Sequence, residues 1–127
     1  MKVKGLHVLA EMYDCDKELL QDACQLESLV KAAAGENGFK VEHSLFHRFD
    51  KEGISGVIVV PDANLSIHTW PERRQVTVDM VTCREDMDPL ASCESLIGKF
   101  GASHMTAACS EREVDLGSEL GSLTPAV

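Results

Sequence analysis

The order of the predicted elements in this chain is typical of an α/β (α+β) two-layer sandwich, a largely antiparallel sheet with two helices on one face. Three observations predict it. Apolar residues follow a period of two from Phe39 to Cys83, and three- and four-residue steps in the stripe from Leu19 to Ala34. Short turns separate the middle strands, so those strands run antiparallel. The chain has 127 residues, the length of one domain.

The first part of the chain is predicted to hold one strand and one helix. The run from Val3 to Met12 has the half-alternating apolar pattern of a strand. Asp14 and Asp16 then stand where helix N-caps are expected. An apolar stripe from Leu19 to Ala34 follows with helical spacing. We expect Gly35–Gly38 to end this helix, because glycine adopts the left-handed terminal conformation at low cost.

Four strands, a second helix and a last strand are predicted from Phe39 onward. The four strands are Phe39 to His47, Ile54 to Val60, Leu65 to Trp70 and Gln75 to Thr82. Asp88 and Pro89 occupy the cap and first-turn positions of a helix over Leu90–Phe100, which Gly101 closes. Ser103–Ser110 completes the sheet. Residues 1–115 are therefore expected to form a single domain, and 116–127 a flexible C-terminal tail.

Composition and charge exclude several classes of function. The formal net charge is −9 and the sequence pI is about 4.9. No basic stretch provides the positive surface that a nucleic-acid backbone requires, so no nucleic-acid partner is expected. No apolar run approaches the roughly 20 residues that cross a bilayer, and the N-terminus lacks the pattern of a signal peptide. We expect no membrane association.

The five cysteines are scattered and odd in number, and none forms a C-x-x-C pair. This spacing suits neither a disulfide framework nor a zinc site. We expect most of them to be reduced, buried residues of a cytoplasmic protein.

Polar residues are densest around the third and fourth predicted strands. They are Ser55, Asp62, Asn64, Ser66, His68, Thr69, Trp70 and Glu72, with Cys83 at the end of the next strand. His43 and His47 lie four residues apart on a strand, about 13 Å, too far to share a metal ion, so no metal is expected. A nucleophilic pair of Cys83 and His68 is physically possible if their strands pair.

Five segments of the chain together resemble the short bacterial and archaeal S-adenosylmethionine decarboxylases. They are Gly5–Glu11, Phe46–Phe49, Gly53–Val57, Leu65–Glu72 and Asp79–Cys83. The resemblance extends over about residues 1–115 without large gaps, and the block from Ser66 to Glu72 is highly specific to that family.

The resemblance implies a pyruvoyl cofactor that the protein makes from an internal serine. In the family, the serine hydroxyl attacks the preceding carbonyl, the peptide becomes an ester, and elimination leaves a pyruvoyl group at a new chain end. Its ketone forms a Schiff base with the substrate and withdraws electrons while carbon dioxide leaves. The implied reaction is decarboxylation of S-adenosylmethionine for spermidine (polyamine) biosynthesis. The implied assembly is a homodimer with each active site near the subunit interface.

The family's processing and proton-transfer residues match three positions of this chain. Ser55 matches the residue that polarises the scissile region, and His68 matches the base that removes the proton for elimination. Cys83 matches the acid that returns a proton to the α-carbon of the substrate.

The family's substrate-binding residues match four further positions. Phe49 and Trp70 match the aromatic pair for the adenine and sulfonium end, where a cation over a π face is favourable. Glu72 matches the carboxylate on the ribose hydroxyls, and Leu65 also matches a substrate-binding position.

The chain departs from the family at the cleavage site, where the usual Glu-Ser-His reads Asp62-Ala63-Asn64. Because Ala63 has no hydroxyl, nothing attacks the carbonyl of Asp62. We therefore expect one uncleaved, inactive chain without a pyruvoyl group. Ser66 cannot substitute, since an offset of three residues reverses the strand face.

Three interpretations of Ala63 stay open. The chain is a proenzyme whose serine was replaced, or a non-catalytic paralogue that acts as a binding or regulatory subunit, or a relative of enzymes that decarboxylate another amino acid such as arginine or ornithine. The joint presence of Ser55, His68 and Cys83 favours the first, whereas the changes at Asp62 and Asn64 favour divergence of the lineage.

Overall fold

A computed structural model describes residues 2–51, 53–61 and 63–115. The tail expected over 116–127 lies outside these described residues. The elements in chain order are β1 (Lys2–Tyr13), η1 (Leu19–Gln21), α1 (Ala23–Glu36), β2 (His43–Phe49), β3 (Gly53–Val60), β4 (Ala63–Trp70), η2 (Pro71–Arg73), β5 (Gln75–Thr82), α2 (Pro89–Phe100) and β6 (His104–Asp115).

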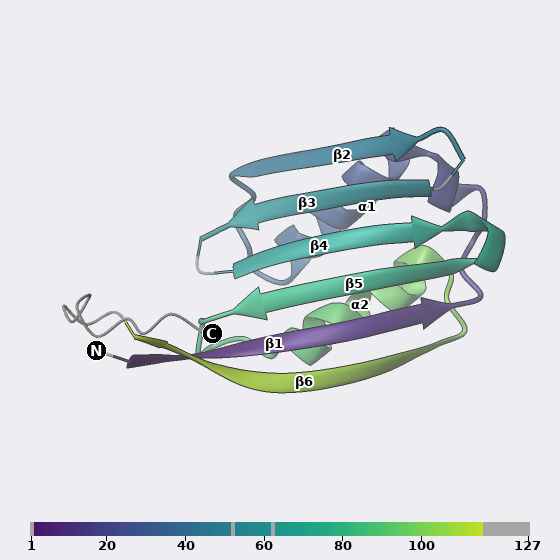
Figure 1. The fold of residues 1–127 in the computed structure, drawn as a ribbon. Helices are drawn as coiled ribbons and strands as arrows, with labels where there is room; N and C mark the ends of the chain where they lie inside the picture. Colours follow the sequence, from purple (N-terminus) through teal and green to yellow (C-terminus); the bar gives the residue numbers. More distant parts are fainter. Residues whose placement is uncertain (1, 52, 62, 116–127) are drawn as a thin grey trace, which may run out of the picture.

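The strands form one six-stranded sheet in the order β2-β3-β4-β5-β1-β6 (Figure 1). Every neighbouring pair is antiparallel. Consecutive short turns join β2 to β5, whereas β1 comes from the start of the chain and lies between β5 and β6. The predicted α+β sandwich is confirmed.

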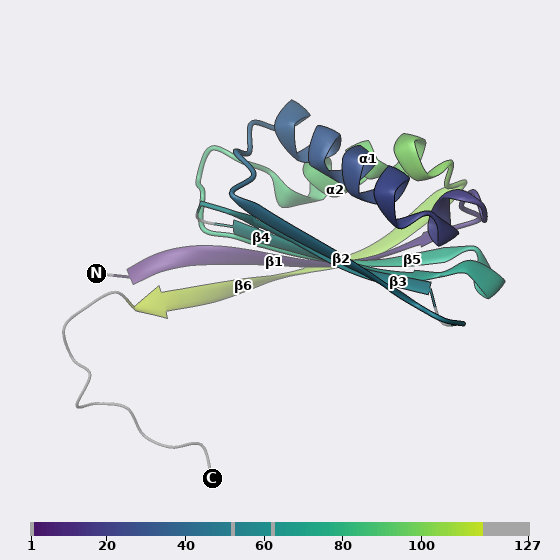
Figure 2. The same ribbon diagram turned by 90° about the horizontal axis from the view of Figure 1, so that it is seen from above.

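Both helices lie on the same side of the sheet, and we call the other side the open face (Figure 2). Side chains alternate between the two sides along each strand. On the helix side, the strands bury Val8, Met12, Ile54, Ile58, Ile67, Val76, Val78 and Met80 against Leu26, Val30, Leu96 and Phe100 of the helices. This layer is the hydrophobic core.

The first helix begins later than predicted. Leu19 and Leu20 are buried in the short turn η1, and α1 starts only after Asp22, whose carboxylate accepts a hydrogen bond from the Gln25 backbone at 3.0 Å. The prediction of Asp14 or Asp16 as the cap was wrong. Asp22 has an extended backbone (φ −110°, ψ 98°), which interrupts the helical spacing that the two leucines begin.

The ends of both helices agree better with their sequence signals. α1 ends at Glu36, and the Asn37 amide donates to the Ala33 carbonyl and to the Ser95 hydroxyl, at 2.8 and 3.0 Å. The Asp88 carboxylate caps α2, and Gly101 closes it with a left-handed backbone (φ 68°).

Strand boundaries also differ from the prediction, most of all at the start of β2 and the end of β6. β2 begins at His43, because the Phe39 backbone N–H donates to the Ala34 carbonyl of α1 at 2.9 Å instead of joining the sheet. The Phe39 ring is buried in the core, 5.5 Å from the Arg84 guanidinium. β6 continues to Asp115, beyond the predicted end at Ser110, since it pairs with the full length of β1.

Glycine is required in β3 at Gly56. A Cβ there would overlap the ring of Phe46, which lies across the strand from the neighbouring β2. The ring occupies the space that a side chain at this position would fill.

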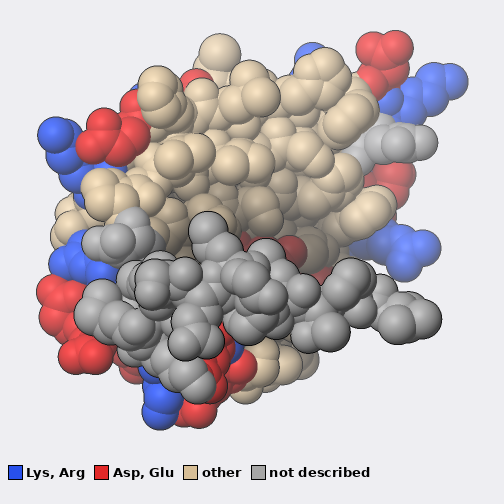
Figure 3. Space-filling view, turned by 60° about the vertical axis from the view of Figure 1, so that its left-hand side comes forward, with Lys and Arg blue, Asp and Glu red and all other residues tan. Residues whose placement is uncertain are grey.

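The open face carries most of the exposed apolar surface of the described residues. Of the seven large hydrophobic residues that are exposed, all but Leu90 lie on it: Leu9, Leu45, Phe49, Val57, Val59 and Trp70. Figure 3, in which the left-hand side of Figure 1 comes forward, shows an uncharged area in its upper half with charged side chains at the margins.

The cysteines only partly follow the sequence expectation. All five are free thiols, but only Cys15 and Cys93 are buried, whereas Cys24 and Cys109 are exposed and Cys83 is half-buried. The expectation that most are buried was wrong. No helix among the described residues is long and apolar enough to cross a membrane.

Candidate active site

Ser55 and His68 face each other on the open face. They are direct partners in the register of β3 and β4, and the Ser55 hydroxyl lies 2.6 Å from His68 Nδ1. The other ring nitrogen, Nε2, is buried and has no hydrogen-bond partner among the described residues. Leaving a buried polar atom unpaired costs about 1–3 kcal/mol, so such atoms are concentrated at functional sites. The pair is therefore the candidate proton-transfer site.

An aromatic wall surrounds the imidazole. The Trp70 ring packs at 4.2 Å from the His68 ring, centroid to centroid, and Phe49 at 6.2 Å. Both residues keep about two fifths of their surface exposed, 43% for Trp70 and 39% for Phe49. Exposed aromatic faces beside a histidine suit a flat or cationic ligand.

Trp70 is itself held by polar residues of two neighbouring strands, which the sequence reasoning did not single out. Its indole nitrogen donates to the Thr77 hydroxyl at 3.0 Å, and Thr77 donates to Glu11 at 2.8 Å. Only the strand order could have indicated this group, because β1 and β5 are far apart in the chain.

Ala63 and Cys83 lie at the opposite end of β4 and β5. Ala63 opens β4, faces the helix side and packs against the core; its register partner is Thr82, the residue before Cys83. A Cβ on Gly5 would lie 3.4 Å from the Cys83 sulfur, so the lack of a side chain at Gly5 leaves room beside the thiol. Asp62, the other half of the predicted cleavage site, lies outside the described residues.

The two ends are too far apart to act together within one chain. His68 is five strand residues from Ala63, which is about 17 Å at ~3.4 Å per residue. Its partner across the ladder is Thr77, six residues (about 20 Å) from Cys83. The structure therefore contradicts the alternative of a Cys83–His68 nucleophilic pair within one chain.

The remaining predicted substrate residues fall on different surfaces. Glu72, in η2, is exposed, lies 3.9 Å from the Lys17 amine, and shares with Phe49 a cleft of about 440 Å³. Leu65 lies on the helix side, where it lines with Ala63 an apolar cavity of about 20 Å³. Glu72 is thus near the aromatic wall, whereas Leu65 is separated from it by the sheet.

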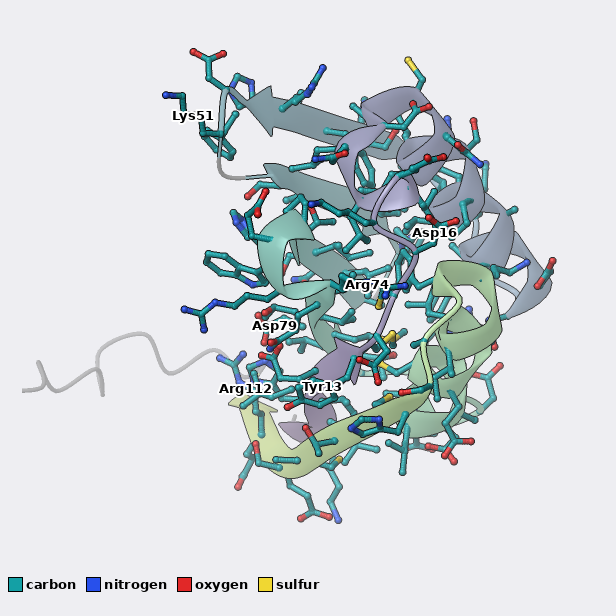
Figure 4. The ribbon with its side chains drawn as sticks, turned by 90° about the vertical axis from the view of Figure 1, so that its right-hand side faces the viewer. Tyr13, Asp16, Lys51, Arg74, Asp79 and Arg112 are labelled. Atoms are coloured by element: carbon teal, nitrogen blue, oxygen red, sulfur yellow. The ribbon has the colours of Figure 1, made fainter. Side chains whose placement is uncertain are left out.

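No three His, Cys, Asp or Glu side chains gather as metal ligands anywhere in the described parts of the chain. On the open face, His7 Nε2 lies 3.5 Å from an Asp79 carboxylate oxygen. Figure 4 shows Asp79 and Arg112 projecting from this face, away from the helices.

Comparison with known proteins defines the class first. The family model for S-adenosylmethionine decarboxylase matches residues 6–113. A solved adenosylmethionine decarboxylase from Aquifex aeolicus superposes with a TM-score of 0.79 at 27% identity, covering 93% of this chain and 98% of that one. These matches indicate a decarboxylating lyase.

Curated relatives narrow the class to a family. S-adenosylmethionine decarboxylase proenzymes from Pelotomaculum thermopropionicum and Acetivibrio thermocellus are 43% and 40% identical to this chain. The alignments cover 84% and 90% of this chain, and 85% and 92% of the relatives. The chain belongs to the S-adenosylmethionine decarboxylase family.

Proposed function

We propose that this chain is an S-adenosylmethionine decarboxylase proenzyme that stays uncleaved because residue 63 is alanine. The observation that carries the proposal is the Ser55–His68 hydrogen bond of 2.6 Å, kept together with the aromatic wall although the hydroxyl at residue 63 is absent. His68 Nε2 is buried and unpaired in the described structure, and unpaired buried polar groups of this kind occur at functional sites, which supports the proposal.

The residues present do not fit a pyruvoyl group in this chain. Its precursor is a serine hydroxyl that attacks the carbonyl next to it, and the methyl group of Ala63 has no nucleophilic oxygen. Ser66 lies on the other side of β4 from Ala63, so it does not replace the missing group. Binding, in contrast, does not depend on residue 63.

The surfaces proposed for binding are intact. A sulfonium cation is attracted by the π faces of Trp70 and Phe49, and a ribose diol can donate hydrogen bonds to the Glu72 carboxylate in the adjoining cleft. We propose that the uncleaved chain binds S-adenosylmethionine there, in the cytoplasm.

The substitution Ala63→Ser tests whether the alanine at residue 63 prevents cleavage. We expect the variant to split into two fragments, with intact mass showing cleavage between residues 62 and 63, and to release carbon dioxide from carboxyl-labelled S-adenosylmethionine. Ala63→Thr, with a hydroxyl on a bulkier side chain, is expected to cleave more slowly, and Ala63→Gly not at all. An Ala63→Ser protein that folds, binds S-adenosylmethionine and stays whole would overturn the proposal.

The ligand distinguishes the remaining interpretations. Calorimetry of the unaltered chain should show binding of S-adenosylmethionine and no binding of arginine or ornithine. Tighter binding of either of those amino acids would favour a different parent substrate. Binding of a partner decarboxylase instead of any amino acid would favour a regulatory subunit.

We further propose that a second copy of the chain covers the open face. Six exposed large hydrophobics lie on that face, and Leu45 alone is 72% exposed. A two-fold axis running across the strands, between two facing sheets, reverses the strand direction of the second copy. The Ala63–Cys83 end of one copy then lies opposite the Ser55–His68 end of the other, which removes the separation of about 17 Å along the strands.

Mixing two variants tests this arrangement directly. The Ala63→Ser/His68→Ala chain alone is expected to remain whole. After unfolding and refolding with the unaltered chain, which supplies His68 but cannot cleave itself, the doubly substituted chain should be cut. The matched control adds the single variant His68→Ala, which has neither the serine nor the histidine, in place of the unaltered chain. Equal cleavage with both added chains, or a monomer by native mass spectrometry at micromolar concentration, would refute the shared site.

A further inference from the structure

A line of hydrogen bonds crosses three strands of the open face and ends on the indole of Trp70. In β1, the Glu11 carboxylate accepts from the Thr77 hydroxyl at 2.8 Å and from the Gln75 amide at 2.8 Å. In β5, Thr77 accepts from the Trp70 indole N–H at 3.0 Å. Register places these groups side by side, since Glu11 is the partner of Thr77 and Gln75 is the partner of Trp70.

The chemistry of these groups fixes the direction of the line. An ionised carboxylate can only accept hydrogen bonds, and an indole N–H can only donate one. Thr77 has one hydroxyl hydrogen, which points to Glu11, so its lone pair is left for Trp70. Each bond in such a chain polarises the next, and the negative charge of Glu11 strengthens both.

Trp70 needs this support because packing covers only part of its ring. The indole is 43% exposed and projects from the open face, yet its ring lies 4.2 Å from the ring of His68. An exposed side chain ordinarily samples several rotamers, and each one lost on binding weakens affinity. A hydrogen bond at the indole edge removes that cost before a ligand arrives.

We propose that Glu11 and Thr77 are positioning residues, which orient Trp70 against His68 and so shape the ligand-binding side of the candidate site. The inference rests on the proposed function for its ligand, because Trp70 is there proposed to contact the sulfonium end of S-adenosylmethionine. The orientation of the indole itself stands on the hydrogen bonds alone.

The chain offers a direct probe of this orientation, because Trp70 is its one tryptophan. A ¹⁵N-labelled sample therefore gives a single indole N–H signal, and intrinsic fluorescence reports on the same ring. Thr77→Val keeps the branched shape that suits a strand and removes both hydrogen bonds. Thr77→Ser keeps the hydroxyl and should restore what the valine removes.

A matched control lies on the same face. Thr106 in β6 is the partner of Glu11 on the side away from Thr77, and its hydroxyl bonds the Tyr13 hydroxyl at 3.2 Å instead of a group of this line. Thr106→Val therefore removes an exposed hydroxyl next to Glu11 without removing a hydrogen bond of the line. Glu11→Gln tests the negative charge of Glu11. The carboxamide has nearly the size of the carboxylate, but it is uncharged and has only one oxygen that accepts hydrogen bonds.

In Thr77→Val the indole N–H signal should move and its hydrogen exchange should quicken about tenfold, the factor expected for one lost hydrogen bond. The dissociation constant for S-adenosylmethionine should rise about five- to tenfold. Glu11→Gln should produce the same change in smaller degree, and Thr77→Ser and Thr106→Val should leave both quantities within about twofold of the unaltered chain.

Two results would overturn the inference. In the first, the indole signal and its exchange are the same in Thr77→Val as in Thr106→Val. In the second, the indole is released but S-adenosylmethionine binds Thr77→Val as tightly as the unaltered chain. If the unaltered chain does not bind S-adenosylmethionine at all, the proposed function fails, and the indole signal alone then decides whether Glu11 and Thr77 orient Trp70.

Discussion

The two sides of this sheet differ in how completely their polar groups are satisfied. On the helix side, the buried hydroxyls have partners: Thr69 donates to the Leu20 carbonyl and Ser92 to the Asp88 carbonyl. On the open face, His68 Nε2 is buried without a partner among the described residues, and large apolar side chains remain exposed. The helix side therefore supplies stability, whereas the open face leaves capacity for a ligand and a second copy.

The largest contrast is expected between Leu26→Ala and Leu45→Ala. Leu26 is fully buried in the helix layer, so its truncation should lower the free energy of unfolding by about 2–5 kcal/mol. Leu45, 72% exposed on the open face, should change the stability of the monomer by less than about 0.5 kcal/mol. Urea unfolding at low protein concentration measures both.

The same pair then separates stability from assembly. If a second copy covers the open face, Leu45→Ala should weaken the dimer in sedimentation experiments. Leu26→Ala should not, because Leu26 lies in the helix layer and does not touch the second copy. Equal loss of stability in the two monomers would remove the distinction between the two faces.

Thr69→Val tests whether satisfied polar groups matter on the helix side. The Thr69 hydroxyl accepts from the Ile54 backbone N–H and donates to the Leu20 carbonyl, both at 2.9 Å. Valine leaves these two buried groups unpaired, so the free energy of unfolding should fall by about 1–3 kcal/mol. Ser66→Ala, on the open face, is the control and should cost little. An unchanged free energy of unfolding in Thr69→Val would mean that water reaches the Ile54 N–H and the Leu20 carbonyl.

Alkaline pH should weaken the helix side through its buried thiols. Burial raises the pKa of Cys15 from its ordinary value of 9.0 to about 11, with Asp14 adding to the effect. Burial, followed by Asp88, raises the pKa of Cys93 to about 12. The unfolded thiols ionise at lower pH than the folded ones, so this stability is present below pH 9 and is lost as the pH rises toward 11–12.

Urea midpoints between pH 8 and pH 10.5 measure this loss. The double variant Cys15→Ala/Cys93→Ala should show a shallower decline over the same range, while Cys24→Ala/Cys109→Ala, which removes two exposed thiols, should follow the unaltered chain. Parallel curves for all three proteins would rule out the buried thiols as the cause.

The smallest expected effect is at the start of α1. Asp22→Ala removes the acceptor for the Gln25 backbone N–H and should cost about 1 kcal/mol, whereas Asp22→Asn keeps an acceptor and should cost less. Thermal unfolding of the two variants, compared at neutral pH, gives the difference. A larger loss of stability in Asp22→Asn than in Asp22→Ala would show that the hydrogen bond from the Gln25 N–H does not account for the effect.

Local periodicity predicted the fold well because each strand buries one side. Alternating residues such as Val76, Val78 and Met80 indicated both the strand and its core-facing side, and the structure confirms them as buried. The cap of α1 was missed because three aspartates precede the helix, and Leu19 and Leu20 continue the apolar spacing across a turn that is not part of it.

The candidate site was predictable residue by residue but not in its spatial arrangement. The resemblance selected Ser55, His68 and Cys83, and only the first two meet in one chain. Their separation from Cys83, and the support of Trp70 by Glu11, depend on the register of β4, β5 and β1. No local pattern in the sequence encodes which strand lies beside which.

The ring of Phe46 over Gly56 links two positions that are ten residues apart. Because the ring takes the volume of the missing side chain, neither residue can change alone without a collision or a void. Related proteins should therefore exchange the two together: wherever position 56 acquires a side chain, position 46 is expected to have shrunk, and such paired substitutions would leave a covariation signal between β2 and β3.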